Sequence, residues 1–175
     1  MGKAVSAYEA HGELATIYDF GNGVKEKWVG GSKAWRNNNP GNLTPAKAHP
    51  NQIGVAWGMA VFPSWEDGKG AMFAQLRRPL YRNLSLAKAI YQYAPPKFNP
   101  TENYISFVLA HVNEGKAENE KINRDTVLSS LSDERLWDVV NAMISFEKTT
   151  EGKIVKIYPK TGLYIWHTSH DEKVK

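Results

Sequence analysis

The most informative stretch of this chain is Ala34-Trp35-Arg36-Asn37-Asn38-Asn39-Pro40-Gly41-Asn42-Leu43-Thr44, in which three consecutive asparagines precede a Pro-Gly turn. Asn, Pro and Gly favour turns through local side-chain bonding, a fixed φ and tolerance of positive φ, respectively. Four amides and a guanidinium at such short range suit a ligand rich in hydroxyl and amide groups, such as an amino-sugar polymer. The alternative is a surface turn whose polar groups bond to one another.

The composition of the 175 residues narrows the class of protein. Formal charge is +4, from 22 Lys and Arg against 18 Asp and Glu, which is compatible with an anionic partner such as cell wall. No basic stripe alternates with aromatic residues, so we expect no nucleic-acid partner. The absence of cysteine excludes disulfide frameworks, zinc–cysteine sites and cysteine-nucleophile hydrolases.

Several other site types lack their sequence signals. The histidines form neither an HExxH motif nor a clustered ligand set, and no GxSxG motif occurs, so we expect no metal, no cofactor and no serine esterase. The first nine residues lack the apolar run of a signal peptide, and no stretch is long enough to span a bilayer. We therefore expect no membrane partner.

Two hairpins and several helices are expected along the chain. One hairpin covers residues 18–29 with its turn at Gly21-Asn22-Gly23, and a second pairs residues 154–158 with 163–166. Helices are expected to begin after four polar residues, namely Ser64, Ser85, Asn99 and Ser132. Asn99 followed by Pro100 is a particularly clear start, with a capping side chain and a proline at the first helical position.

These elements predict an α+β fold, a mainly helical domain with small β-hairpins rather than a large sheet. We expect a single domain over residues 1–175, with residues 1–13 as a candidate linker and residues 167–175 as a polar tail.

One acid stands out by its spacing. An apolar stripe runs along the last expected helix and consists of Leu136, Val139, Val140, Met143 and Ile144. Glu147 continues this stripe and lies at the C-terminal end of the helix, where the helix dipole disfavours negative charge. Burial and the dipole both raise a carboxyl pKa, as a glycosidase needs for its general acid. The alternative is a glutamate at a frayed helix end that points into water.

Three blocks of the chain together resemble a known group of proteins. They are AWRNNNPGNLT at 34–44, AVFPSWEDGKGAMFAQLR at 60–77 and YRNLSLAKAIYQYAPPKFNPTENYISFV at 81–108. In their order and spacing these blocks resemble lysozyme-like peptidoglycan hydrolases of phage and secreted-toxin type that carry an RNNNPGN motif. The resemblance implies a lysozyme-like catalytic domain.

The order of the blocks departs from that group in one respect. Members usually place a glutamate helix ending in Ile-x-x-x-Glu-Gly-aromatic immediately before the RNNNPGN loop, whereas here the hairpin of residues 18–29 precedes it. The matching segment is Ala142 to Gly152, with Lys148 where the group usually has glycine. We infer a circularly permuted order, in which the Glu147 helix packs beside the Asn-rich loop.

The resemblance implies a muramidase or a lytic transglycosylase with peptidoglycan as its substrate. Glu147 would be the catalytic acid, and the residues that hold N-acetyl and hydroxyl groups would be Arg36, Asn37, Asn39 and Asn42. Tyr93 and Tyr104 would stack on sugar rings, or else belong to the core. A second carboxylate, if one takes part, would be Asp19 or Glu26, although hairpins commonly turn such residues to solvent.

Other interpretations remain open at this stage. Glu13 and Glu151 compete with Glu147 for the role of the acid. A non-catalytic module for cell-wall binding or virion structure would keep the sugar-binding groups without the acid. A chitinase-like enzyme would differ only in its substrate.

The expected setting follows from the implied function. A wall hydrolase without a signal peptide is delivered by a phage particle, a holin or a secretion system, and acts in the bacterial periplasm or cell wall. We therefore expect an antibacterial effector or a phage lysis protein. In the first case the producing cell needs an immunity protein that blocks the active site.

Overall fold

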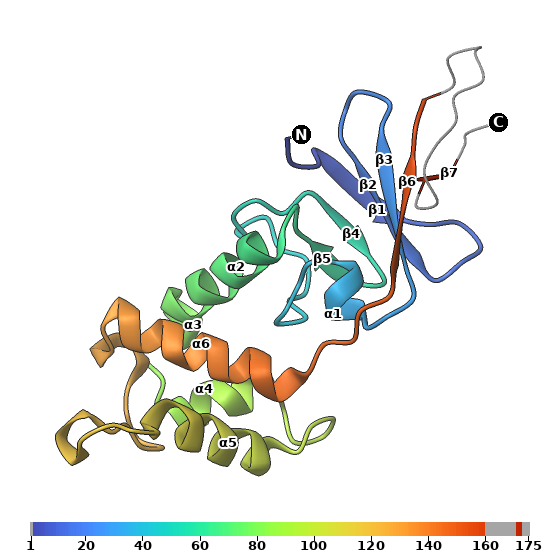
Figure 1. The fold of residues 1–175 in the computed structure, drawn as a ribbon. Helices are drawn as coiled ribbons and strands as arrows, with labels where there is room; N and C mark the ends of the chain where they lie inside the picture. Colours follow the sequence, from blue (N-terminus) through green and yellow to red (C-terminus); the bar gives the residue numbers. More distant parts are fainter. Residues whose placement is uncertain (1, 160–170, 173–175) are drawn as a thin grey trace. The chain divides into compact units, whose positions relative to one another are not determined.

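The computed structural model describes residues 2–159 and 171–172 and divides the chain into two compact units (Figure 1). Unit 1 consists of Met1–Ala71 and Thr149–Lys175, and unit 2 consists of Met72–Lys148. Unit 1 is thus assembled from both ends of the sequence, while unit 2 is one continuous segment. Helix α2, Trp65–Arg77, includes the point where the chain passes from the first unit to the second.

Unit 1 is built on a mixed sheet with the strand order β5-β4-β1-β2-β3-β6-β7. Its strands are β1 (Ser6–Glu9), β2 (Ala15–Asp19), β3 (Lys25–Val29), β4 (Gly54–Ala56), β5 (Met59–Val61), β6 (Lys153–Ile157) and β7 (Asp171–Glu172). The β1–β4 and β6–β7 pairs are parallel, and the other pairs are antiparallel. Because β6 comes from the end of the chain and pairs with β3, the sheet joins both sequence segments of unit 1.

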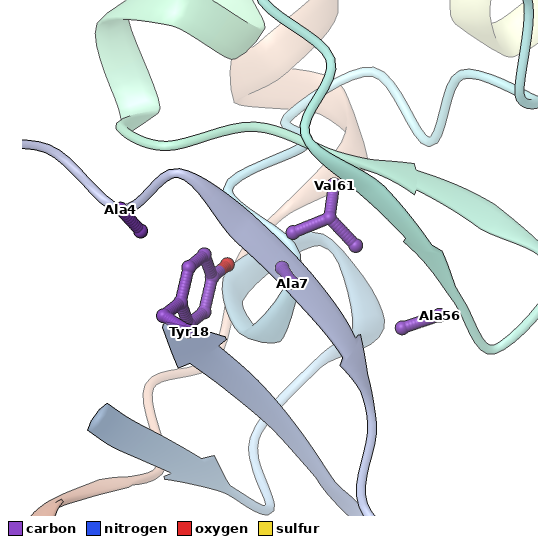
Figure 2. Close-up of a cluster of buried hydrophobic side chains, with 5 residues drawn as sticks. All are labelled: Ala4, Ala7, Tyr18, Ala56 and Val61. Carbon is purple, nitrogen blue, oxygen red and sulfur yellow. The ribbon is translucent and has the colours of Figure 1, made fainter. Parts of the chain in front are cut away.

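One face of this sheet carries the main apolar cluster of unit 1. Figure 2 shows its buried members, which are Ala4, Ala7, Tyr18, Ala56 and Val61. Trp28 on β3 extends the cluster, since its ring packs against Tyr18 at 5.1 Å and against Trp35 at 4.8 Å between centroids. Trp35 belongs to α1 (Lys33–Arg36), so the Asn-rich segment begins on this buried face.

The structure confirms the first hairpin and corrects two other expectations. Strands β2 and β3 pair from Asp19↔Lys25 to Ala15↔Val29, around the predicted glycine turn. The sheet is larger than small hairpins, because β1, β4, β5 and β6 all add to this pair. Residues 1–13 are not a linker, since β1 lies inside the sheet and buries Ala7. The α+β class is correct.

Unit 2 is helical in the part of the chain that the structure describes. It contains the end of α2, then α3 (Pro79–Arg82), α4 (Leu86–Tyr93), α5 (Thr101–Asn113) and α6 (Asp133–Glu147), with short 3-10 turns at Glu118–Glu120 and Leu128–Ser130. Helix α5 packs against both α4 and α6 (Figure 1). The buried residues of α6 are Leu136, Val139, Val140, Ala142 and Met143, so its predicted apolar stripe faces the core, apart from half-buried Ile144.

Three of the four predicted helix starts are correct. The hydroxyls of Ser64, Ser85 and Ser132 each accept a hydrogen bond from the backbone N–H three residues later. Asn99 is the exception, because its amide donates to the carbonyl of Pro95 and α5 begins at Thr101. The second predicted hairpin is described only in its first strand, β6, since residues 163–166 lie outside the described residues.

We predict opposite effects of alanine at two glycines of α2. A Cβ at Gly68 would lie 2.1 Å from the carbonyl oxygen of Asn38, whereas a Cβ at Gly70 would meet nothing within 4 Å. Gly68→Ala should therefore lower the free energy of unfolding by roughly 1–3 kcal/mol through overpacking. Gly70→Ala should raise it by up to about 1 kcal/mol, because alanine is the better helix former. Urea denaturation of both variants measures these changes, and equal effects would contradict the close approach of Asn38.

Candidate functional site

The Asn-rich segment follows a single turn of helix on the buried face of the unit 1 sheet. Ser32 caps α1 by accepting a hydrogen bond from the Trp35 N–H, and Asn37 ends the helix. Asn38 and Asn42 have φ values of 49° and 48°. This left-handed region is open to asparagine more readily than to most residues, which explains two of the four amides by backbone geometry.

The other two amides form the hydrogen bonds that fix the segment to the sheet. Asn37 accepts from the Thr16 hydroxyl on β2 at 2.8 Å and donates to the Ala56 carbonyl on β4 at 2.8 Å. Asn39 donates to the carbonyls of Leu43 and Ala60 and accepts from the Leu43 N–H, at 2.9 to 3.0 Å. Both side chains are fully buried. Their polar groups are therefore used within unit 1.

Arg36 is buried beside these amides, with 4% of its surface exposed. Its Nη1 donates to the carbonyls of Gly30 and Gly31, at 3.1 and 2.7 Å. Its Nε is buried and has no hydrogen-bond partner, and Asn42 Oδ1 is in the same situation. Burial lowers the pKa of the Arg36 guanidinium. Of the four residues predicted to hold N-acetyl and hydroxyl groups, Arg36 and Asn42 are thus the two that keep a buried atom without a partner.

Trp57 is a member of this neighbourhood that sequence reasoning missed. The guanidinium carbon of Arg36 lies 5.6 Å from the centre of the Trp57 ring. Trp57 occupies the β4–β5 turn with φ 58°, an uncommon value for a bulky residue, and its N–H and indole N–H donate to Glu9 and to the Ala15 carbonyl. The available signal was the Trp57-Gly58 pair between two short apolar runs, which marks a two-residue hairpin.

In unit 2, Glu147 is the last residue of α6 and is partly buried. Burial raises the pKa of its carboxyl group, and a hydrogen bond with the Tyr104 side chain opposes part of that rise. Lys148 follows with φ 52°, in the region that favours glycine, which is the residue that the resembling group usually has at this position. The environment of Glu147 therefore favours the protonated form of its carboxyl group more than water does.

The two tyrosines singled out in the sequence surround this carboxyl group. Burial raises the pKa of both the Tyr93 and the Tyr104 hydroxyl, and the nearby Glu147 charge adds to both shifts. Tyr104 is a core residue, 1% exposed, and its ring packs on Phe146 at 4.3 Å between centroids. Tyr93 is partly exposed on α4 and contacts Tyr81 edge to face. Of the two, Tyr93 is the one with surface available to a ligand.

The other candidate acids have partners or are exposed. Asp19 accepts a hydrogen bond from the Gly21 N–H, and Glu26 accepts one from the Trp28 indole. Glu13 forms an exposed ion pair with Lys27 at 2.8 Å. Glu151 is exposed in the segment that leads into β6. Glu147 remains the strongest candidate acid, because burial raises the pKa of its carboxyl group.

No protein-family model matches this chain, and no curated protein is similar enough to count as a relative. Among the described residues, no three acidic or histidine side chains gather in a way that could bind a metal ion. In the same part of the chain, no helix has the length and apolar character needed to cross a bilayer. The expected packing of the Glu147 helix beside the Asn-rich loop remains a prediction.

We predict that Asn39 and Asn42 differ sharply in their effect on folding. Asn39→Ala removes three buried hydrogen bonds and should lower the free energy of unfolding by roughly 3 kcal/mol or more. Asn42→Gly keeps the positive φ and removes an unpartnered acceptor, so the change should stay within about 1 kcal/mol. Urea denaturation tests both. A large loss in Asn42→Gly would mean that this side chain also holds the fold.

A second prediction concerns Glu147 and pH. The raised pKa means that ionisation of Glu147 costs more in the folded state than in the unfolded state. Glu147→Gln should therefore be more stable than the wild type at neutral pH. This advantage should vanish as the pH falls through the raised pKa toward the ordinary glutamate value of about 4.3.

Thermal unfolding of both proteins from acid to neutral pH measures the difference. Glu134→Gln is the control, because Glu134 is exposed on the first turn of the same helix. A difference between Glu147→Gln and the wild type that does not change with pH would show that the Glu147 carboxyl group is solvated.

Proposed function

We propose that this protein cleaves the glycan strands of peptidoglycan, with Glu147 as the general acid. The observation that carries the proposal is the partly buried carboxyl of Glu147 at the end of α6, whose pKa is raised by burial. A raised pKa favours the protonated form of a carboxyl group, and that form can donate its proton to a leaving oxygen. We also propose a lysozyme-like catalytic domain, on the strength of the three sequence blocks.

The proposed reaction begins with proton transfer from Glu147 to the oxygen between N-acetylmuramic acid and N-acetylglucosamine. The bond from this oxygen to the anomeric carbon breaks, the leaving sugar carries the proton as a hydroxyl, and Glu147 becomes a carboxylate. Water or the 6-hydroxyl of the muramic acid then attacks the anomeric carbon, and Glu147 recovers a proton from that nucleophile. The first nucleophile makes the protein a muramidase, and the second makes it a lytic transglycosylase.

A muramidase of the common two-carboxylate type needs a second acid near the sugar. Asp19 and Glu26, the two acids proposed for this role, accept hydrogen bonds from groups of their own hairpin. The route through the 6-hydroxyl of the muramic acid requires only a single acid.

The biological setting belongs to the same proposal. A wall-cleaving enzyme of this kind acts as an antibacterial effector or a phage lysis protein in the periplasm or cell wall. An effector requires an immunity protein in the cell that makes it. A chain that binds the wall without cutting it would instead be a binding or virion module.

We predict that Glu147→Gln lowers the rate of glycan cleavage by about 10²- to 10⁴-fold, the usual contribution of a general acid. Mass spectrometry of fragments released from purified peptidoglycan gives both the rate and the product. Glu134→Gln is the control on the same helix and should cleave at the wild-type rate. Activity of the wild type should fall as the pH rises through the raised pKa of Glu147, because only the protonated acid can donate.

The products decide between the two routes. Ends in the 1,6-anhydro form identify a transglycosylase, and reducing ends identify a muramidase. Unimpaired cleavage by Glu147→Gln would reject Glu147 as the general acid and leave Glu13 and Glu151 as the candidates. Wall binding by the wild type without any release would favour the binding module.

A further inference from the structure

Arg36 is a buried cation without an anion. Only 4% of its surface is exposed, and among the described residues it has no carboxylate partner. Burial of an unpaired charge is costly, so buried guanidinium groups are normally matched by an acid. Burial also lowers the pKa of this guanidinium, with no opposing effect from an acid. The position of Arg36 therefore calls for an explanation beyond stability.

The hydrogen bonds of Arg36 leave one particular edge of the guanidinium without a partner. Nη1 uses its two hydrogens on the carbonyls of Gly30 and Gly31. Nε is buried without a partner, and Nη2 has none within the described residues. Nε and Nη2 form two parallel donors on the same side of the planar group, and this spacing matches the two oxygens of a carboxylate.

Trp57 completes this arrangement. Its ring lies over the guanidinium at 5.6 Å, so it shields one face of the cation while it leaves the donor edge in place. Glu9 and the Ala15 carbonyl hold Trp57 by hydrogen bonds to its backbone and indole N–H groups. The turn keeps its uncommon positive φ under these contacts, as is frequent where backbone strain serves a binding site.

We propose that Arg36 and Trp57 form a receptor for a carboxylate of the substrate, bound by the Nε–Nη2 edge with the Trp57 ring beside it. The nature of the polymer rests on the proposed function. Peptidoglycan has two sources of carboxylate, the lactyl group of muramic acid where it carries no peptide, and the acidic residues of the peptide stems. A polymer of N-acetylglucosamine alone has neither, so this receptor would also separate cell wall from chitin.

The test is a titration of the full chain followed by NMR on the Nε–H signal of Arg36, which Arg36→Lys identifies by its loss. The probes are N-acetylmuramic acid, a muramoyl dipeptide in which the lactyl carboxylate is blocked, N-acetylglucosamine and acetate. We expect the Nε–H signal to move with one or both muramic compounds and to stay with N-acetylglucosamine. Movement with N-acetylmuramic acid identifies the lactyl carboxylate as the ligand, and movement with the muramoyl dipeptide identifies the stem carboxylate.

Variants give the second readout, the affinity for the muramic compound that binds. Arg36→Lys keeps the charge but loses the paired donors and should bind about tenfold more weakly. Trp57→Asn removes the ring with a residue that accepts positive φ, so it should fold and also bind more weakly. Lys25→Gln is the matched control, since Lys25 lies over the exposed Tyr8 ring at the same 5.6 Å, and it should bind as the wild type does.

Several outcomes would overturn the receptor: no movement of the Nε–H signal with any carboxylate, equal movement with acetate and the muramic compounds, or unchanged affinity in Arg36→Lys. These titrations require no cleavage. Carboxylate binding in a protein that releases no glycan would reject the proposed function and leave the receptor standing. Cleavage of the glycan by a protein whose carboxylate binding does not depend on Arg36 would reject the receptor and leave the proposed function standing.

Discussion

The buried amides of Asn37 and Asn39 are the interaction on which unit 1 depends. Asn37 connects the end of α1 to β2 and β4, which lie on either side of β1, and Asn39 connects the same segment to β5. Each amide pairs with backbone or hydroxyl groups that would otherwise be buried without partners. Leaving one such group unpaired costs about 1–3 kcal/mol. The Asn-rich segment therefore connects the strands of unit 1 through buried hydrogen bonds.

These buried hydrogen bonds also explain how the charged group of Arg36 comes to be buried beside them. Because Asn37 and Asn39 fix the backbone, Arg36 is held with Nη1 on two carbonyls and its Nε without a partner. A flexible surface arginine would turn to water, whereas this one is positioned before any ligand arrives. Binding energy is then not spent on ordering the side chain, which is the advantage of preorganisation.

Glu147 in unit 2 illustrates a different use of burial. Phe146, its neighbour on α6, packs against Tyr104 and Phe107 of α5 and so fixes the end of the helix. The carboxyl group of Glu147 is consequently kept among tyrosines, and desolvation favours its protonated form. One unit thus holds a cation without an anion, and the other holds an acid that favours its proton.

Periodicity and capping residues determined much of the fold from sequence alone. They predicted the first hairpin, the helices after Ser64, Ser85 and Ser132, and the apolar stripe of α6, because these features depend on neighbours within a few residues. The sequence could not reveal that β1 and β6 join a wider sheet, since strand pairing depends on distant partners. The sequence likewise predicted that the asparagines would bind groups of a ligand. Only the tertiary structure decided that two of them bond inward, and that Trp57 lies over Arg36, because both facts depend on contacts between residues far apart in the chain.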